Sequence, residues 1–396
     1  MNLTELESPC FIFNTGVYNE NAVSFSNALK RHFNSHIIGV SVKTNALPYM
    51  LCMAKEFGYY AEVVSHDEYE LALLCGFEKS RIIYNGPMKS KTTFIDAALH
   101  GAIINIETHR EIDWLQELPS DRTYKIGIRI NVNLTNFSAE DDPEHTDSRF
   151  GFSYESGDFV EVYKRLISFP HIKVNGLHIH RHSNTRSLLF YRRLTQLALN
   201  IAKQYNISLD YLDIGGGFFG IFRDKPTYEQ YASAISVELN KYPEYQKICL
   251  IVEPGNALTA SAFDFLSTVI DVKKTKDNLY VTTDASRNDL DPTYNKTDYI
   301  KEIIYTEELE RKQREEQIIC GCTCLEFDRL FTIKQAPELV VGDIVLYHNV
   351  GAYTMCLTPL FIRYIPNVYA CDANGNVKLV RNKWTAREYI ALSSLS

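Results

Sequence analysis

The chain contains 396 residues, of which 45% are hydrophobic and 23% are charged. This is the composition of an ordinary globular protein, and the length is sufficient for two domains. The formal net charge is −8 and no basic stripe is present, which argues against a nucleic-acid partner and gives no support to a membrane partner.

The N-terminal sequence, MNLTELESPCFIF, has acidic residues where a signal peptide would carry positive charge. No segment reaches the roughly 18 apolar residues that a membrane-spanning helix requires. The nine cysteines are odd in number and scattered, a pattern typical of reduced thiols rather than of a disulfide framework. These features predict a cytoplasmic protein.

Short apolar runs alternate with amphipathic segments through the first two thirds of the chain. The runs predict eight strands, at residues 36–42, 59–64, 81–85, 102–106, 125–132, 172–180, 209–215 and 247–253. Segments of helical periodicity, such as DEYELALLCGF and SLLFYRRLTQLALNIAKQY, lie between them. Apolar strands that alternate with helices indicate a parallel sheet covered by helices. We predict an α/β fold with a (β/α)8 TIM-type barrel over residues 30–260; an open doubly wound sheet is the alternative.

The sequence changes character after residue 260. FLSTVIDVKK, DNLYVTTDAS, GDIVLYHNVG and FIRYIPNVYACD are β-type runs separated by turn residues. The charged stretch at 302–317, EIIYTEELERKQREEQ, predicts one solvated helix. We therefore predict a mostly β second domain made of residues 1–29 and 261–396.

Reactive residues recur where the predicted barrel strands end, and active sites of such barrels lie at the carboxyl ends of the strands. The residues at these ends are Lys43, Glu62, Asn85, Arg129, His180, the glycines Gly215, Gly216 and Gly217, and Glu253. Any one of them alone has an ordinary structural explanation. Their recurrence at one end of the barrel indicates a functional site there.

Three of these strand ends together match the needs of pyridoxal phosphate. A lysine shielded by apolar neighbours, such as Lys43, can form a Schiff base, although this stretch by itself favours an ordinary surface lysine. Consecutive glycines after the seventh strand can turn N–H groups toward a phosphate, or simply make a tight turn. Glu253, after the eighth strand, can keep the pyridine nitrogen protonated so that the ring withdraws electrons. His180 can supply a flat face for the ring.

The sequence resembles the fold-type III pyridoxal-phosphate decarboxylases, the family of diaminopimelate, ornithine and carboxynorspermidine decarboxylases, whose fold is like that of alanine racemase. The matching segments, in the family's order, are SVKTN, VVSHDEYELALLCGF, RIIYNGPMKS, IRIN, SRFGFS, GLHIHRHSN, DIGGGFFG and EPGN. The resemblance implies a set of residues that hold pyridoxal 5'-phosphate: Lys43, Arg129, His180, Ser183, Gly215, Gly216, Gly217, Glu253, Gly255 and Tyr353.

The resemblance extends into the second domain through DASRNDLDPTY, CGCTCLEFD and GAYTM. It implies a homodimer with shared active sites, in which Cys324 reaches the partner's site. The catalytic residues implied are Lys43, Cys324, His180 and Glu253, and the substrate contacts are Asn85, Asp328, Arg287 and Tyr294. Cys320, Cys322 and Cys324 have no second Cys/His pair at zinc-site spacing, so we predict no metal.

The sequence departs from the family at positions that bear on the substrate. Asn256 replaces the arginine of the EPGR motif, Leu325 replaces the acid after the cysteine, and His182 replaces a glycine. An arginine is also missing after Leu290. These losses remove groups that would bind a distal zwitterion. We therefore expect an amino acid or an amino-acid conjugate other than standard diaminopimelate, with Arg149, Arg181 or Arg287 as candidate replacements for the lost charge.

The mechanism implied is removal of the α-carboxylate as carbon dioxide, followed by protonation from Cys324 or Lys43. A racemase on the same fold is one alternative, but such enzymes place an arginine, not an acid like Glu253, at the pyridine nitrogen. A non-catalytic homologue is another alternative. It would be expected to lose Lys43 or His180, and both are present.

Overall fold

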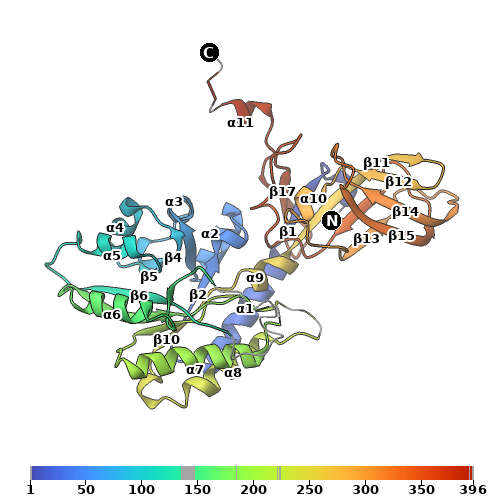
Figure 1. Cartoon of the computed structure of the whole chain (residues 1–396). Coiled ribbons are helices and arrows are strands. Elements are labelled where there is room, and N and C mark those ends of the chain that lie inside the picture. The colour runs from blue at the N-terminus through green and yellow to red at the C-terminus, as the bar shows by residue number, and fades with distance from the viewer. Residues whose placement is uncertain are drawn as a thin grey trace. The chain divides into compact units, whose positions relative to one another are not determined.

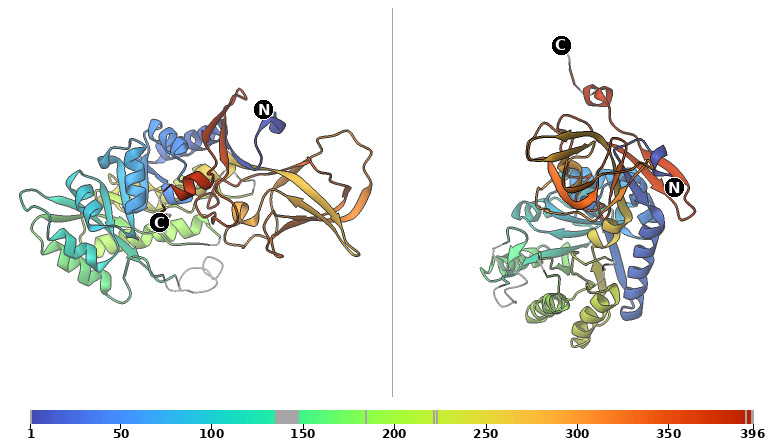
Figure 2. Two further views of the ribbon diagram at one scale, coloured as in Figure 1. Left: turned by 90° about the horizontal axis from the view of Figure 1, so that it is seen from above. Right: turned by 90° about the vertical axis from the view of Figure 1, so that its right-hand side faces the viewer.

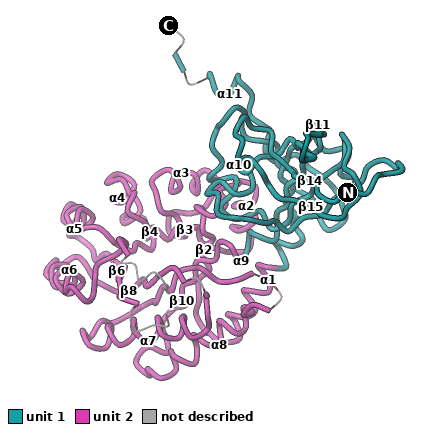
Figure 3. Tube along the Cα trace, turned by 45° about the vertical axis from the view of Figure 1, so that its right-hand side comes forward, with its two compact units in different colours: residues 1–20, 258–396 teal, residues 21–257 magenta. Residues whose placement is uncertain are grey.

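The structure is a computed structural model that describes residues 2–134, 148–183, 185–220, 222, 224–391 and 393–394. The chain separates into two compact units, one of residues 21–257 and one of residues 1–20 with 258–396 (Figure 3). Within the described residues, none of the helices combines the length and the hydropathy needed to span a bilayer.

The first unit is a closed barrel of eight parallel strands (Figure 1). Going round the barrel these are β2 (His36–Ser41), β3 (Tyr60–Ser65), β4 (Ile82–Met88), β5 (Ile103–Ile106), β6 (Tyr124–Asn131), β8 (Ile172–His178), β9 (Tyr211–Asp213) and β10 (Cys249–Val252). β10 pairs with β2, and β5 pairs with β6, so the ring has no free edge. The eight predicted strands and the barrel are confirmed, and the open sheet is excluded. The two-residue strand β7 (Phe152–Ser153) pairs with β6.

Helices lie outside this ring of strands (Figure 2). They are α1 (Thr15–His32), α2 (Pro48–Glu56), α3 (His66–Leu74), α4 (Lys91–Leu99), α5 (His109–Leu115), α6 (Asp158–Ile167), α7 (Leu188–Gln204), α8 (Tyr228–Leu239) and α9 (Asn256–Thr259). Several begin with a capping side chain: Ser65 accepts from the Glu68 N–H, and Thr227 accepts from the Gln230 N–H. Such caps fix the residue at which each helix begins after the loop that precedes it.

The interior of the barrel is filled by side chains, with Tyr211 packed against Ile83 and Ile251. Gly127 of β6 and Gly176 of β8 make room for its ring, because a Cβ at either position would lie within 2.1 Å of the Tyr211 side chain. The Tyr211 hydroxyl donates to Asn105 Oδ1 at 2.7 Å. The barrel interior around Tyr211 is therefore a packed core, and the candidate functional residues lie toward the carboxyl ends of the strands.

The second unit is a mostly β structure, as predicted. Its sheet has the order β15-β14-β12-β11-β1-β17-β18, with β16 paired to β11 and β13 to β16. The strands are β1 (Cys10–Asn14), β11 (Phe263–Lys274), β12 (Leu279–Thr283), β13 (Lys301–Ile304), β14 (Gln313–Cys320), β15 (Arg329–Pro337), β16 (Ile344–Tyr347), β17 (Asn367–Cys371) and β18 (Val377–Arg381); the helices are α10 (Arg287–Leu290) and α11 (Ala386–Ile390). Its core includes Cys10, Ile12, Leu266, Ile344, Leu346 and Cys371.

The helix predicted at 302–317 is wrong, because this segment contributes to β13 and β14. β14 pairs with β12 on one side and with β15 on the other, and Gln317 and Ile319 are buried at alternate positions. Two-sided strand pairing outweighs the helix propensity of the charged residues. The opposite charges Glu316 and Lys334 face each other across the β14–β15 ladder.

Candidate active site

Three acidic side chains from three parts of the barrel are buried at its carboxyl end. Glu62 lies on β3, Asp213 ends β9, and Glu253 follows β10; their residues are at most 5% exposed. Lys43 lies in the 3₁₀ turn Val42–Thr44 that follows β2. Parallel strands bring their carboxyl ends to one edge, so residues far apart in the sequence meet there.

Lys43 forms an ion pair with the first of these acids. Its Nζ lies 2.6 Å from Glu62 Oε2 and donates to Ser41 Oγ at 2.9 Å. Burial alone would raise the pKa of Glu62, but the Lys43 ammonium and the hydrogen bonds of Ser41 and Asn85 outweigh it, so the pKa lies below its usual value. The Lys43 side chain remains 38% exposed, which leaves its amine accessible from outside the barrel.

Two asparagines connect the acids. Asn85 Nδ2 donates to Glu62 Oε1 at 3.2 Å and to Glu253 Oε1 at 2.5 Å. Asn105 Nδ2 donates to Asn85 Oδ1 at 2.9 Å and to Asp213 Oδ2 at 3.0 Å. The network fixes the positions of all three carboxyl groups, since each receives at least one buried amide N–H.

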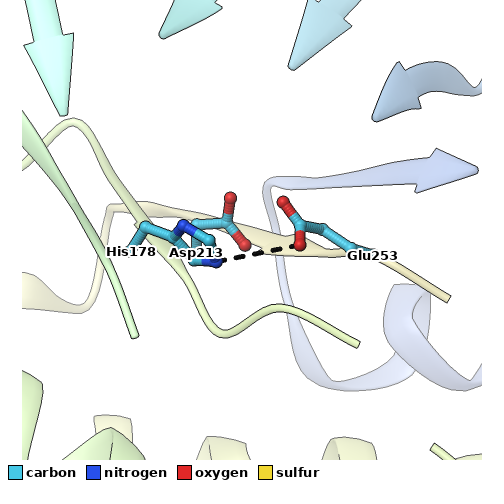
Figure 4. A group of neighbouring side chains, drawn as sticks. All are labelled: His178, Asp213 and Glu253. Atoms are coloured by element: carbon cyan, nitrogen blue, oxygen red, sulfur yellow. Dashed lines mark ion pairs between the residues drawn. The ribbon is translucent and has the colours of Figure 1, made fainter. Parts of the chain in front are cut away.

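The Asp213 and Glu253 carboxyl groups lie close together beside His178 (Figure 4), and they share a side-chain hydrogen bond. Burial raises the pKa of Glu253 well above its usual value, and the negative charges of Asp213 and Glu62 raise it further. Burial likewise raises the pKa of Asp213, to about 7. Two carboxyl groups this close cannot both ionise easily, so the cofactor-free pair retains a proton near neutral pH. His178 Nε2 lies 3.8 Å from Glu253 Oε2.

The glycine turn after β9 packs directly against His180. Gly215 and Gly217 have positive φ angles of 72° and 87°, which glycine adopts without strain. A Cβ at Gly215 would lie 2.5 Å from the His180 ring, so only glycine allows this approach. Burial, with the positive charges of Arg129 and Lys43, lowers the pKa of His180 to about 3 and keeps its ring neutral.

The other predicted barrel residues occupy defined positions near this edge. Arg129 Nη1 lies 2.8 Å from Glu107 Oε2 and is almost completely buried. Ser183 is buried, and its Oγ accepts from the Arg186 N–H at 2.9 Å. Gly255 lets the EPGN turn approach the lysine turn, because a Cβ there would lie 2.0 Å from Thr44 Oγ1.

The predicted residues of the second unit are grouped around the cysteine loop, residues 320–328. The Asp328 carboxylate accepts from Thr323 Oγ1 at 2.6 Å and from the Arg287 N–H at 2.9 Å. The Arg287 guanidinium lies 2.6 Å from Asp291 and 4.6 Å above the Tyr294 ring. Cys324 is exposed within this loop.

Tyr353 lies on the loop after β16. Its residue is 47% exposed and has a φ of 55°, a conformation that is uncommon outside glycine. The exposed ring is available to a ligand or to another chain. Its contact with the cofactor stays a prediction.

Among the described residues, the group of side chains whose ligand atoms lie within 4.8 Å of one another is His178, Asp213 and Glu253. The three cysteines of the C-x-C-x-C segment are not such a group. All nine cysteines are free thiols.

Sequence reasoning missed two members of this site and gave a third no role. Asp213 precedes the three glycines of the DIGGG segment and His178 lies two residues before His180, so each stands next to a residue with a stronger motif signal. Glu62 was noted only as a strand-end residue. A usable signal exists for Asp213 and His178, since each ends a barrel strand with a titratable side chain.

The residues present fit pyridoxal phosphate. Ionising both Asp213 and Glu253 is unfavourable when no cation lies beside them. A protonated pyridine nitrogen next to Glu253 would offset that unfavourable energy. The neutral His180 ring offers a flat surface beside the glycine turn. Arg129 Nε and both His178 nitrogens are buried without a hydrogen-bond partner among the described residues. A lysine, a buried acid and a glycine turn at one edge of a closed barrel define a pyridoxal-phosphate enzyme.

The chain belongs to the pyridoxal-dependent decarboxylases: residues 21–260 match the family described as pyridoxal-dependent decarboxylase, pyridoxal binding domain. It is therefore a carboxy-lyase of amino-acid metabolism that uses pyridoxal phosphate. The sequence-based assignments of family, cofactor and reaction type are confirmed.

Named relatives fall within the same group of enzymes. L-glutamyl-[BtrI acyl-carrier protein] decarboxylase of Niallia circulans is 26% identical over 376 residues, which are 89% of this chain and 86% of that protein. Diaminopimelate decarboxylase of Aquifex aeolicus is 26% identical, with coverage of 95% and 89%. The crystal structure of diaminopimelate decarboxylase from M. jannaschii has a TM-score of 0.85 at 24% identity, covers 99% of this chain and 93% of that one, and shows the shared fold.

Proposed function

We propose that this decarboxylase acts on an amino acid whose far end is masked in a conjugate, rather than on a free diamino acid. The observation that carries the proposal is the loss of the distal charge-binding groups: the chain has Asn256 and Leu325 where the family has an arginine and an acid. Leu325 is half-buried in the cysteine loop. An apolar side chain there cannot pair with a distal ammonium group, but it can contact an uncharged linkage.

Pyridoxal phosphate, when bound, supplies an electron-withdrawing ring that stabilises the charge left by the departing carboxylate. We assign its attachment to Lys43, its pyridine nitrogen to Glu253 and its ring face to His180. Gly215, Gly216, Gly217 and Ser183 are assigned to the phosphate, with further contacts from Arg129, Gly255 and Tyr353. In this assignment Glu62 keeps the Lys43 amine in place, since its carboxylate lies 2.6 Å away.

Asn85 orients Glu253 by donating to its Oε1. Its polar atoms already bond Glu62, Glu253 and Asn105, so its additional contact with substrate stays a prediction, like those of Arg287, Tyr294 and Asp328. A base or acid must return a proton to the carbon that loses carbon dioxide. We assign this proton to Cys324 or Lys43.

Cys324 is assigned to the site of a second copy of the chain, so that two sites are shared by a homodimer. Mixing inactive Lys43→Ala and Cys324→Ser proteins tests this assignment. With random reassociation, half of the dimers are mixed and each has one intact site of two, so about a quarter of wild-type activity should return. No recovery, in protein shown to have exchanged subunits, would contradict a shared site.

The acyl-carrier-protein substrate in the name of the Niallia circulans relative supports a conjugate as the substrate class. The relatives named above are decarboxylases, so the comparisons give no support to the racemase alternative. The buried Glu253 agrees with this, because an acid at the pyridine nitrogen favours a strong electron sink.

The test is carbon dioxide release from a panel of substrates. It should contain meso-diaminopimelate, ornithine, free glutamate, and glutamate and lysine carrying an amide or thioester at the side chain. We expect at least one conjugate to react faster than every free amino acid. Efficient turnover of meso-diaminopimelate alone would overturn the proposed substrate class while leaving the reaction type intact.

A variant pair sharpens this test. Leu325→Glu restores an acid to the cysteine loop and should increase turnover of a free diamino acid relative to a conjugate. Leu325→Gln is the matched control, since it has the same length and polarity without the charge. If both variants change the substrate preference equally, charge at this position does not select the substrate.

A further inference from the structure

Asp213 connects the two ends of the cofactor site. Its Oδ1 accepts from the Gly215 N–H at 2.9 Å, which fixes the first residue of the glycine turn. Its Oδ2 accepts from Asn105 at 3.0 Å. Its carboxyl group also shares a hydrogen bond with Glu253. One buried side chain therefore touches both the turn assigned to the phosphate and the acid assigned to the pyridine nitrogen.

The main chain strengthens this connection. The Glu253 N–H donates to the Gly215 carbonyl at 2.9 Å, and a Cβ at Gly216 would lie 2.3 Å from the Glu253 carbonyl oxygen. The turn and the acid are thus in direct backbone contact. A change at Asp213 is expected to be felt at both places.

The charged groups around Asp213 favour a proton on the Asp213–Glu253 carboxyl pair. The titratable groups that face it are Glu253 itself, Glu62 from β3 with its partner Lys43, His178 from β8, and Tyr211 from its own strand. Lys43 already balances Glu62. The charge of the buried His178 ring is suppressed by burial, which places its pKa well below the usual value. A second ionised carboxyl group beside Glu253 would therefore lack a balancing cation from these neighbours.

We infer that Asp213 is a positioning residue that keeps one proton behind Glu253, so that Glu253 faces the pyridine nitrogen as a single oriented anion. The shared proton moves onto Asp213, whose O–H then donates to Glu253, while the Glu253 carboxylate accepts the pyridine N–H. No proton leaves the pair in this step. The inference rests on the role proposed above for Glu253.

Asp213→Asn is the decisive variant, because its amide N–H can donate to Glu253 in place of the O–H of a protonated Asp213. The amide nitrogen cannot accept from Asn105, but that hydrogen bond is lost with and without the cofactor and so does not enter the difference. The measurements are the dissociation constant of pyridoxal phosphate and the ¹⁵N chemical shift of ¹⁵N-labelled cofactor, which reports protonation of the pyridine nitrogen. We expect a dissociation constant within about threefold of wild type and a protonated nitrogen. A tenfold or larger loss of affinity, or an unprotonated nitrogen, would show that Asp213 acts as an ion and would overturn the inference.

Asp213→Ala removes the acceptor for the Gly215 N–H and the donor to Glu253, so affinity should fall about tenfold or more. Affinity equal to wild type would also overturn the inference. If the alanine variant does not fold, the asparagine variant still decides the question. Asp210→Asn is the matched control, because Asp210 precedes the same strand and pairs with Lys125 at a partly exposed position.

Glu253→Gln separates this inference from the proposal on which it rests. In Glu253→Gln the ¹⁵N shift should change to that of an unprotonated nitrogen. An unchanged shift would overturn the role of Glu253, and the inference about Asp213 with it. A changed shift together with failure of Asp213→Asn overturns only the role of Asp213.

Discussion

The acid cluster of the barrel and the cysteine loop of the second unit use buried carboxylates in different ways. In the barrel, Glu62, Asp213 and Glu253 come from three separate strands and face one another. In the cysteine loop, Asp328 accepts hydrogen bonds from Thr323 and from the Arg287 backbone, which hold the loop in shape. The barrel concentrates like charges, whereas the loop satisfies its buried acid, Asp328, with neutral donors.

The two kinds of buried acid have different expected roles. Like charges that are buried together raise one another's pKa, and such sites are typical of catalysis. An acid whose bonds are satisfied locally is typical of a structural role. Removing an acid from the barrel should therefore change chemistry more than stability, whereas removing Asp328 should lower the stability of the second unit.

The largest expected effect is on catalysis, from Glu253→Gln. The amide keeps the shape but removes the charge that stabilises the reaction, and loss of such a group lowers turnover by about 100-fold or more. The rate of carbon dioxide release from the best substrate of the panel measures it. Glu229→Gln is the control, since Glu229 lies on α8 and pairs with Arg31 at the surface. Equal rates in the two variants would remove Glu253 from the mechanism.

The next effect is on stability, from Asp328→Asn in the cysteine loop. The residue is only 2% exposed, and its carboxylate accepts from Thr323 and Arg287. Loss of these charge-assisted hydrogen bonds should lower the free energy of unfolding by about 1.5–3 kcal/mol. Urea denaturation measures the change. Asp271→Asn at an exposed position should alter stability by less than about 0.5 kcal/mol, and a similar small change for Asp328 would disprove its structural role.

A smaller effect is expected on the pH dependence of the stability of the cofactor-free protein. Burial raises the pKa of Asp213 from the ordinary 3.8 to about 7, so the folded protein keeps a proton that the unfolded chain releases. The retained proton of Asp213 therefore lowers the free energy of unfolding as pH rises from 3.8 to about 7, by up to about 1.4 kcal/mol per pH unit. The lowered pKa of His180 acts in the opposite direction, because that stability is lost as pH falls below 6.5.

Comparison with the Asp213→Asn variant measures how much Asp213 contributes to the pH dependence of stability. The variant cannot hold the proton, so its stability relative to wild type should rise with pH over this window. Thermal unfolding of both cofactor-free proteins across the range measures the difference. Parallel stability curves would show that Asp213 does not titrate as described.

The smallest expected effect on stability is from Cys324→Ser. Cys324 is exposed, unlike the buried acid of the same loop, and exposed substitutions of similar size change the free energy of unfolding by less than about 0.5 kcal/mol. The same urea denaturation assay measures it. A loss comparable to that of Asp328→Asn would mean that Cys324 supports the loop.

The parts of the molecule that follow from local patterns were predictable from the sequence. Each barrel strand is an apolar run between helical segments, and closure of the ring then places Lys43, Asn85, His180 and Glu253 at one edge. Pairing between segments that are distant in the sequence could not be predicted in this way. The charged residues of β14 are held in a strand by β12 and β15, which no local pattern reveals. The partnership of Asp213 with Glu253 likewise depends on adjacent strands that are about 40 residues apart in the sequence.

The assignment of Lys43 as the cofactor lysine is tested most directly by the absorbance spectrum of the purified protein after incubation with pyridoxal phosphate. Lys43 lies 2.6 Å from Glu62 and is accessible from outside the barrel, so it should bind the cofactor covalently. We predict a visible Schiff-base band in the wild-type protein and its loss in Lys43→Ala, while the control Lys203→Ala on the surface of α7 keeps it. A band that survives in Lys43→Ala, or no band in the wild-type protein, would contradict the assignment of this site.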